Sequence, residues 1–508
     1  MKINLLEFFE ESVKRNPTKI AVIDGERQMS FSELNIKSDI LAMHISKNIG
    51  TVNRPIAVFL PKGIESVMSN VAIAKSANVF MNLDIKTPSQ RIGNILDLIE
   101  PAAIITNSAN YDKIELISKN IIVIVLDNVD LSACIDHESV VNLWEQIIDT
   151  DPFCIINTSG STGTPKGVAL CHLNFIDFFY RSQEIFQFTE NEIVGSLSPI
   201  VFDIYVFELC LLMAKSATIV VLPAHLSAFP ARILSIMQEM RVTFIFWVPT
   251  IMVNMANMGL ISEADLPSLR LIWFAGEVFP TKQFNIWRRS LPKTKFANLY
   301  GPIETALDSI FYVVEREIDD DEPLPIGYAY KNTDILLLDE EDRRITCIGE
   351  EGEICVRGSS LALGYYNNPE KTAQSFVQNP LNTHYPERIY RTGDIAVIND
   401  RGEMVFRGRK DSLIKHQGYR IELGEIEHVI VNTLHLAKNV CATYDYQSKQ
   451  IILFYENNKE LSPAEFRKSL AVELPKYMIP TVYNYVEELQ RNTNGKIDRL
   501  YYKQLVND

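Results

Sequence analysis

Long apolar runs are absent from this chain, although 47% of its 508 residues are hydrophobic. The longest stretches, such as residues 121–126, have the length of a β-strand and cannot span a bilayer. No signal peptide is visible, because near the N-terminus Leu5, Leu6, Phe8 and Phe9 alternate with glutamates, which predicts an amphipathic surface helix. We therefore expect a soluble, cytoplasmic protein with no membrane partner.

Paired cysteines and an excess of positive charge are also missing. The seven cysteines include no Cys-x-x-Cys pair, and no His and Cys residues cluster at metal-ligand spacing. An odd number of cysteines without framework spacing is typical of reduced thiols. The formal net charge of −15 argues against non-specific binding of DNA or RNA, so nucleic acid is not an expected partner.

Apolar runs alternate with helical patterns through the first 300 residues. Residues 103–106 and 154–157 fit buried strands, whereas residues 64–76 and 231–239 fit helices. This alternation predicts layered α/β subdomains with mainly parallel sheets. From about residue 326, short strands and glycine turns predict a smaller β-rich subdomain.

A polar loop, Asn-Thr-Ser-Gly-Ser-Thr-Gly-Thr-Pro-Lys-Gly at residues 157–167, lies between two apolar runs. Glycines let several backbone N–H groups point at one anion, while hydroxyls and a lysine add donors and charge. The loop does not have the Walker A spacing, and a flexible linker is disfavoured by its apolar flanks and its proline. We predict that it binds a polyphosphate through Thr158, Ser159, Gly160, Ser161, Thr162, Gly163 and Lys166.

Further motifs follow this loop, and together they resemble the AMP-forming adenylating superfamily. That superfamily includes acyl-CoA synthetases, firefly luciferases and the adenylation domains of nonribosomal peptide synthetases. The motifs are NLYGPIE at 298–304, YRTGD at 390–394, GRKD at 408–411, GYRIELGEIE at 418–427 and NGKIDR at 494–499. The resemblance implies ATP-dependent formation of an acyl adenylate with release of pyrophosphate.

The resemblance also implies a domain organisation. Residues 1–410 would form a large N-terminal domain, and residues 411–508 a small, mobile α+β lid that turns at a hinge near Asp411. Gly418 would let the loop after the hinge approach an incoming thiol closely. Three glutamates in this region, Glu422, Glu425 and Glu427, are expected on a solvated helix face.

Roles at the nucleotide follow from the resemblance residue by residue. Glu304 would bind Mg²⁺ on the ATP phosphates, and Lys496 would be catalytic, bridging the substrate carboxylate and the reacting phosphate. The family usually has Thr before this glutamate, where Ile303 stands here, so a neighbour such as Thr305 would supply the phosphate contact or none would. The adenine and ribose would be bound by Asn298, Tyr300, Gly301, Asp394 and Arg409.

Asp203 favours an amino acid as the acid that is activated. In amino-acid-activating members an aspartate at this place pairs with the substrate's α-ammonium, and a buried carboxylate needs such a cation; a simple helix cap is the competing interpretation. Three aromatics predict a small pocket, while Asp308 would pair with a polar or cationic side chain or face solvent. The implied pocket is Asp203, Ile204, Phe207, Phe246, Trp273, Ala275, Leu299, Leu307 and Asp308, with Lys496.

The chain is similar to a stand-alone ligase that loads its amino acid onto the phosphopantetheine thiol of a carrier protein. Residues 274–280 look like those of D-alanine–carrier-protein ligases of teichoic acid synthesis, but Ala275 replaces the cysteine of those ligases. An acyl- or aryl-CoA synthetase is an alternative that Asp203 disfavours. A nucleotide sensor with a decayed site is disfavoured by the joint presence of five site residues, Lys166, Glu304, Asp394, Arg409 and Lys496.

Overall fold

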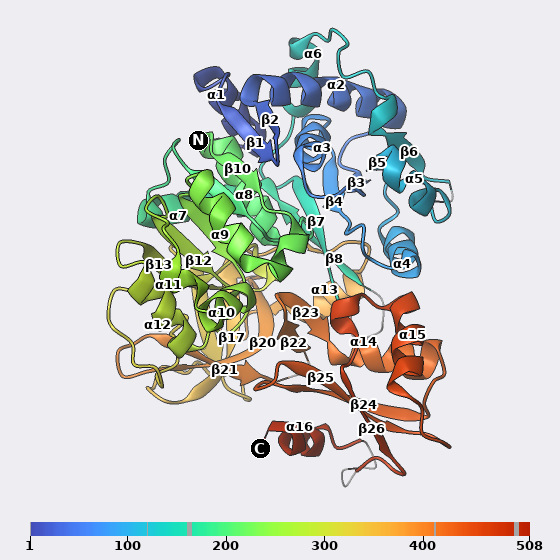
Figure 1. Ribbon diagram of the computed structural model, residues 1–508, viewed down its shortest axis with the longest axis vertical. Helices are drawn as coiled ribbons and strands as arrows, with labels where there is room; N and C mark the ends of the chain where they lie inside the picture. The colour runs from blue at the N-terminus through green and yellow to red at the C-terminus, as the bar shows by residue number, and fades with distance from the viewer. Residues whose placement is uncertain (1, 119, 160–164, 411–412, 492–496, 508) are drawn as a thin grey trace.

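The computed structural model describes residues 2–118, 120–159, 165–410, 413–491 and 497–507 (Figure 1). Nine of its strands form one twisted sheet in the order β15-β14-β13-β12-β11-β9-β10-β1-β2. The strands from β13 to β1 pair in parallel, and antiparallel pairs close both edges. The strands are β1 (Ile20–Asp24), β2 (Arg27–Ser30), β9 (Ile193–Ser196), β10 (Thr218–Val221), β11 (Phe244–Trp247), β12 (Leu271–Phe274), β13 (Lys295–Tyr300), β14 (Ile310–Val313) and β15 (Tyr328–Ala329).

A second sheet carries the polar loop predicted to bind phosphate. Its order is β18-β8-β7-β4-β3-β5-β6, parallel from β7 to β6. β7 and β8 are antiparallel, with Thr158 opposite Lys166, so that the loop connects their ends. The strands are β3 (Pro55–Val58), β4 (Val79–Asn82), β5 (Ala103–Thr106), β6 (Ile122–Val125), β7 (Pro152–Thr158), β8 (Lys166–Cys171) and β18 (Gly364–Tyr365).

Helices cover both sheets, as the alternating pattern predicts. α3 and α8 are buried over nearly their whole length, because apolar residues occupy all of their faces. α2 shows how a helix is delimited: Ser30 and Glu33 form a capping box at its start, and Gly50 in the left-handed conformation follows its end. The helices are α1 (Leu5–Arg15), α2 (Phe31–Ile49), α3 (Ile64–Lys75), α4 (Ser89–Ile99), α5 (Ser108–Glu115), α6 (His137–Trp144), α7 (His172–Phe186), α8 (Asp203–Lys215), α9 (Pro230–Glu239), α10 (Pro249–Asn257), α11 (Leu260–Glu263), α12 (Thr281–Ser290) and α13 (Pro369–Ser375).

The predicted β-rich subdomain is an antiparallel sheet in the order β16-β17-β20-β19, with β21 paired to β20. Its strands are β16 (Thr333–Leu338), β17 (Glu351–Gly358), β19 (Phe376–Gln378), β20 (Arg388–Ile398) and β21 (Met404–Arg409). Glycine turns and strands with one apolar face explain why this part differs in sequence from the layered α/β part.

Residues 413–491 and 497–507 form a small α+β domain below the large one in Figure 1. Its core contains Ile421, Ile426, Leu453, Phe466 and Leu470. Its elements are β22 (Leu413–His416), β23 (Tyr419–Glu422), α14 (Leu423–His428), β24 (Asn439–Asp445), β25 (Gln450–Glu456), α15 (Pro463–Glu473), β26 (Val482–Val486) and α16 (Arg499–Asn507). The predicted fold class is confirmed. Asp411 lies outside the described residues, so the hinge and the boundary at 410 and 411 stay predictions.

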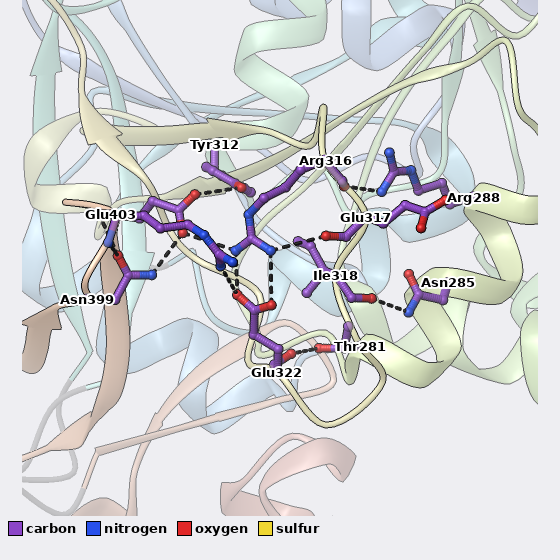
Figure 2. Close-up of polar contacts among 11 residues, drawn as sticks. Thr281, Asn285, Arg288, Tyr312, Arg316, Glu317, Ile318, Glu322, Asn399 and Glu403 are labelled. Carbon is purple, nitrogen blue, oxygen red and sulfur yellow. Dashed lines mark hydrogen bonds and ion pairs between the residues drawn. The ribbon is translucent and has the colours of Figure 1, made fainter.

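A polar network joins the nine-stranded sheet to the β-rich subdomain (Figure 2). Arg316, in the segment between β14 and β15, pairs with Glu322 and with Glu403 beside β21. Glu403 also accepts hydrogen bonds from Tyr312 at 2.8 Å and from the Asn399 side chain at 2.8 Å. These five residues, named here the Arg316 network, fix the subdomain against the sheet with every carboxylate paired.

None of the helices in the described part of the chain combines the length and apolarity needed to cross a membrane.

Candidate functional site

A cavity of about 170 Å³ lies between the large and small domains, beyond the carboxyl ends of the parallel strands. In open α/β sheets this edge is where ligands bind. The small domain covers the cavity with Lys415, Gly418, Tyr419 and Arg420, which come from β22, β23 and the turn between them. The predicted site residues that line it are Thr158, Ser159, Asp203, Ile204, Phe246, Ala275, Gly301, Asp308, Asp394 and Arg409.

Other predicted residues are buried just behind the lining. Asn298 is 8% exposed, and its side-chain amide donates to the Pro325 carbonyl at 2.8 Å, so it faces the sheet rather than the cavity. Tyr300 and Glu304 contact the lining residues Asp394 and Arg420, and Lys166 lies opposite Thr158 in the strand pair, whereas Phe207, Trp273, Leu299 and Leu307 belong to the core. The predicted residues Gly160, Ser161, Thr162, Gly163, Asp411 and Lys496 lie outside the described residues.

The predicted ribose site is assembled by strand register. Asp394 on β20 is directly opposite Arg409 on β21, and their side chains form an ion pair. Tyr300, at the end of β13, donates its hydroxyl to the same carboxylate. Burial and the charge of Asp394 raise the pKa of Tyr300 well above its ordinary value, so the phenol stays a donor. The carboxylate thus faces the cavity with a fixed orientation, as binding of a cis-diol requires.

The predicted polyphosphate and metal residues are paired with the small domain. Lys166 Nζ lies 2.5 Å from Glu422 Oε1, and Glu304 forms an ion pair with Arg420. Ser159 donates its hydroxyl to the Arg420 carbonyl at 2.6 Å and accepts from the Glu422 N–H at 3.0 Å. β23 therefore lies directly on the end of the phosphate loop and on the metal candidate.

Glu304 is fully buried, and both of its oxygens are engaged. One accepts from the Tyr365 hydroxyl at 2.8 Å, and the other is bound by Arg420. Burial alone would raise the pKa of Glu304, but the Arg420 charge and the Tyr365 hydrogen bond outweigh it and hold the pKa below its ordinary value. Thr305, the predicted substitute phosphate contact, is fully buried and donates to the Pro302 carbonyl at 3.0 Å.

The expectation of a solvated helix face for Glu422, Glu425 and Glu427 is wrong. Besides the pair between Glu422 and Lys166, Glu425 is fully buried against Arg91 of α4. Glu427 is 8% exposed and pairs with Arg499. Each partner is at least 72 residues away in the chain, so the local charge pattern did not reveal these pairs.

Aromatic side chains close the inner end of the cavity. Phe207 and Trp273 are stacked, with ring centroids 5.0 Å apart and an interplanar angle of 20°. Phe246, which does line the cavity, meets Trp273 edge-on at 5.4 Å. Phe207 and Trp273 belong to the core beneath Phe246 and do not line the cavity themselves.

Two carboxylates face this end of the cavity. Asp203 is the first residue of α8, and its only hydrogen bond among the described residues is from the adjacent Ile204 N–H at 2.9 Å. Burial raises the pKa of Asp203 to about 6. Asp308 is 5% exposed, so it does not face solvent, and burial together with the charge of Asp203 raises its pKa well above the ordinary value.

Lys415 and Arg420 are the site residues that the sequence analysis missed. Lys415 is part-buried with its ammonium 5.3 Å from the Tyr300 ring centroid, and desolvation lowers its pKa. The sequence signal was the motif that begins at Gly418, because Arg420 lies inside it and Lys415 shortly before it. Gly418 has φ +82°, and a Cβ there would come within 2.7 Å of Val248, so this loop lies close against the large domain, while its approach to an incoming thiol stays a prediction.

Comparison with known proteins agrees with this geometry. Residues 9–366 match the family described as AMP-binding enzyme. Tyrocidine synthase 1 of Brevibacillus parabrevis is 30% identical over 97% of this chain, which spans only 44% of that protein's length. Zwittermicin A synthase ZmaJ of Bacillus cereus is 29% identical, with 100% of this chain and 96% of that protein covered.

Solved structures show the same fold. The adenylation domain AlmE of Vibrio cholerae, in complex with glycyl-adenosine-5'-phosphate, superimposes with a TM-score of 0.86 at 20% identity, covering 99% of this chain and 98% of that one.

Proposed function

This chain belongs to the AMP-binding enzyme family of AMP-forming adenylating ligases, and we propose that it activates an amino acid as its adenylate. The single observation that supports an amino acid is Asp203. Its part-buried carboxylate lines the cavity, and no described cation forms an ion pair with it. A fatty or aryl acid would leave this charge unpaired, whereas the α-ammonium of an amino acid would neutralise it.

In the first half-reaction a carboxylate oxygen of the substrate attacks the α-phosphorus of ATP. An O–P bond forms, the bond to the leaving oxygen breaks, and pyrophosphate departs. Tyr300, Asp394 and Arg409 would hold the nucleoside, and the phosphate loop with Lys166 would hold the leaving group. This chemistry needs positioning and charge neutralisation rather than a covalent catalyst.

A magnesium ion on Glu304 does not fit the arrangement described here. One carboxylate oxygen of Glu304 accepts from Tyr365 and the other pairs with Arg420, whose positive charge stands where a cation would bind. The prediction that Glu304 binds Mg²⁺ therefore requires Arg420 to move away.

β23 and the magnesium pyrophosphate would compete for the same two side chains, Glu304 and Lys166. Arg420 and Glu422 neutralise Glu304 and Lys166 in the way that Mg²⁺ and a phosphate would. We infer that this arrangement follows pyrophosphate release and serves the second half-reaction. There the phosphopantetheine sulfur of a carrier protein would bond to the acyl carbon, and AMP would leave.

Lys496 would act in a different arrangement of the small domain. The helix α16, which follows this motif in the chain, lies on the side of the small domain away from the large one (Figure 1). The resemblance implies that Lys496 enters the cavity when the small domain, residues 411–508, rotates about the proposed hinge at Asp411.

ATP–pyrophosphate exchange across L-, D- and β-amino acids, with D-alanine included, tests the proposal. We expect exchange with at least one amino acid and loading of a phosphopantetheinylated carrier in preference to free CoA. Lys496→Ala should lower exchange by roughly 100-fold or more, while transfer from a preformed adenylate is largely retained. Turnover restricted to fatty or aryl acids with CoA as acceptor would instead establish the CoA synthetase alternative.

A further inference from the structure

The backbone holds Asp308 at the cavity in a conformation that the local sequence does not favour. Ala306 and Leu307, just before it, have φ of 49° and 66°, a left-handed region that costs residues other than glycine about 1 kcal/mol or more each. Gly301 faces this turn so closely that a Cβ there would lie 2.2 Å from the Leu307 carbonyl oxygen. The turn therefore fixes where the Asp308 carboxylate enters the cavity.

The Asp308 carboxylate has no partner of its own among the described residues. It is 5% exposed, lines the cavity, and neither accepts a hydrogen bond nor forms an ion pair in the described part of the chain. Asp203, which lines the same cavity, adds a second negative charge. Lys415 is the near cation, but it lies over the Tyr300 ring and forms no ion pair with either described carboxylate.

A substrate with one ammonium group can neutralise only one of the two carboxylates in this pocket. If Asp203 takes the α-ammonium, a neutral side chain leaves Asp308 buried opposite apolar groups, which is costly for an ionised carboxylate. The α-carboxylate of the substrate cannot help, because it must face the nucleotide phosphate. A second ammonium group on the substrate would neutralise Asp308.

We propose that the substrate is a short diamino monocarboxylic acid, whose side-chain ammonium binds Asp308 while its α-ammonium binds Asp203. This inference rests on the amino acid activation proposed above. Phe246 is an aromatic wall of the cavity, backed by the stack of Phe207 and Trp273, so we limit the proposal to the two shortest such acids, 2,3-diaminopropionate and 2,4-diaminobutyrate.

Matched substrate pairs test the proposal in ATP–pyrophosphate exchange with the full chain. Serine and homoserine have nearly the same shape as 2,3-diaminopropionate and 2,4-diaminobutyrate but carry a hydroxyl instead of the ammonium. We expect kcat/KM for the better diamino acid to exceed that for its hydroxy analogue by roughly 10- to 100-fold. Ornithine and lysine, which are longer, should be poorer than the better short diamino acid.

The variant Asp308→Asn keeps the shape of the side chain and removes its charge. It should abolish the preference, so that the diamino and hydroxy members of a pair differ by less than about threefold. A wild-type enzyme that prefers serine, alanine or glycine, or a variant that keeps the diamino preference, would overturn this inference but leave amino acid activation intact. Exchange with no amino acid at all would overturn both. The wild-type panel decides the question even if the variant does not fold.

Discussion

The Arg316 network and the substrate end of the cavity both contain buried charges, but only the first pairs them. Glu403 is 5% exposed and has Arg316, Tyr312 and Asn399 as partners (Figure 2). Asp308 is about as deeply buried and Asp203 is part-buried, and neither carboxylate forms an ion pair with a described residue. Charges that are paired within the chain hold the fold together, whereas charges left open in a cavity are available to a ligand.

The contributions of the two regions to the stability of the fold should also change with pH in opposite directions. Burial of Glu403 is outweighed by hydrogen bonds from Asn399, Arg316 and Tyr312, so its pKa is lowered. A lowered pKa stabilises the fold above the ordinary value of 4.5, and this contribution is lost as the pH falls through the lowered pKa. Asp203 and Asp308 have raised pKa values. Their contribution to the stability of the fold is therefore complete at low pH and is lost as the pH rises through those raised values.

The largest effect is expected from Asp203→Asn. Removing the charge leaves the substrate ammonium buried without a partner, which should lower kcat/KM for amino-acid-dependent exchange by about 100- to 1000-fold. In the wild-type enzyme kcat/KM should fall as the pH drops through about 6, where Asp203 becomes protonated. Exchange kinetics across pH 5 to 8 measure both.

The exposed Glu263 on α11 supplies the control, since Glu263→Gln should leave exchange kinetics as in the wild type. An Asp203→Asn enzyme that kept its kcat/KM within about threefold would show that this carboxylate is not the ammonium site.

Arg420→Ala should separate the two half-reactions. In the arrangement described, the variant leaves Glu304 buried with one of its partners missing, which disfavours the docking of β23. Transfer from a preformed adenylate to the carrier should therefore slow by about 10- to 100-fold, roughly tenfold more than exchange does. Single-turnover transfer and steady-state exchange give the two rates.

The matched control is Arg407→Ala, an exposed arginine on β21. If Arg420→Ala lowered both half-reactions equally, β23 would not be specific to the second one.

The sequence predicts much of the site because its motifs follow strand ends. Thr158, Ala275 and Gly301 each lie at or just after the end of a strand of the two large sheets, and parallel strands bring their carboxyl ends to one edge. Composition and periodicity likewise predict the layered α/β part and the β-rich subdomain, whose boundaries depend on glycine turns.

Other features depend on contacts that no local pattern encodes. The pairing of Arg420 with Glu304 joins residues 116 apart and requires the small domain in this arrangement. The burial of Asp308 requires a left-handed turn at Ala306 and Leu307, which are not residues that favour it. Trp273 was expected at the cavity, but its strand directs it into the aromatic core beneath.

Arg316→Ala should cost stability rather than activity. The variant leaves Glu403 and Glu322 with one partner fewer at a largely buried junction, which should lower the free energy of unfolding by about 2 kcal/mol. Calorimetry of the variant gives the change in Tm, and exchange kinetics at 25 °C should stay unchanged because the network lies outside the cavity lining.

The surface pair of Arg232 and Glu239, with side chains about half exposed, is the matched control for this effect. Arg232→Ala removes the same charge and should change stability by less than about 1 kcal/mol. Equal effects of the two substitutions would mean that the network contributes no more than an ordinary surface ion pair.

The smallest effect, and the one of opposite sign, is expected from Asp308→Asn in the absence of substrate. An amide keeps the shape but removes a buried charge without a described partner, so the variant should be more stable than the wild type by roughly 1 kcal/mol at pH 8. The gain should shrink toward pH 4, because the raised pKa means that wild-type Asp308 is already neutral there. Melting temperatures measured at both values test this, with the exposed Asp400→Asn as control. A variant that was less stable than the wild type at pH 8 would show that Asp308 is paired within the folded chain, and the contrast with the Arg316 network would then disappear.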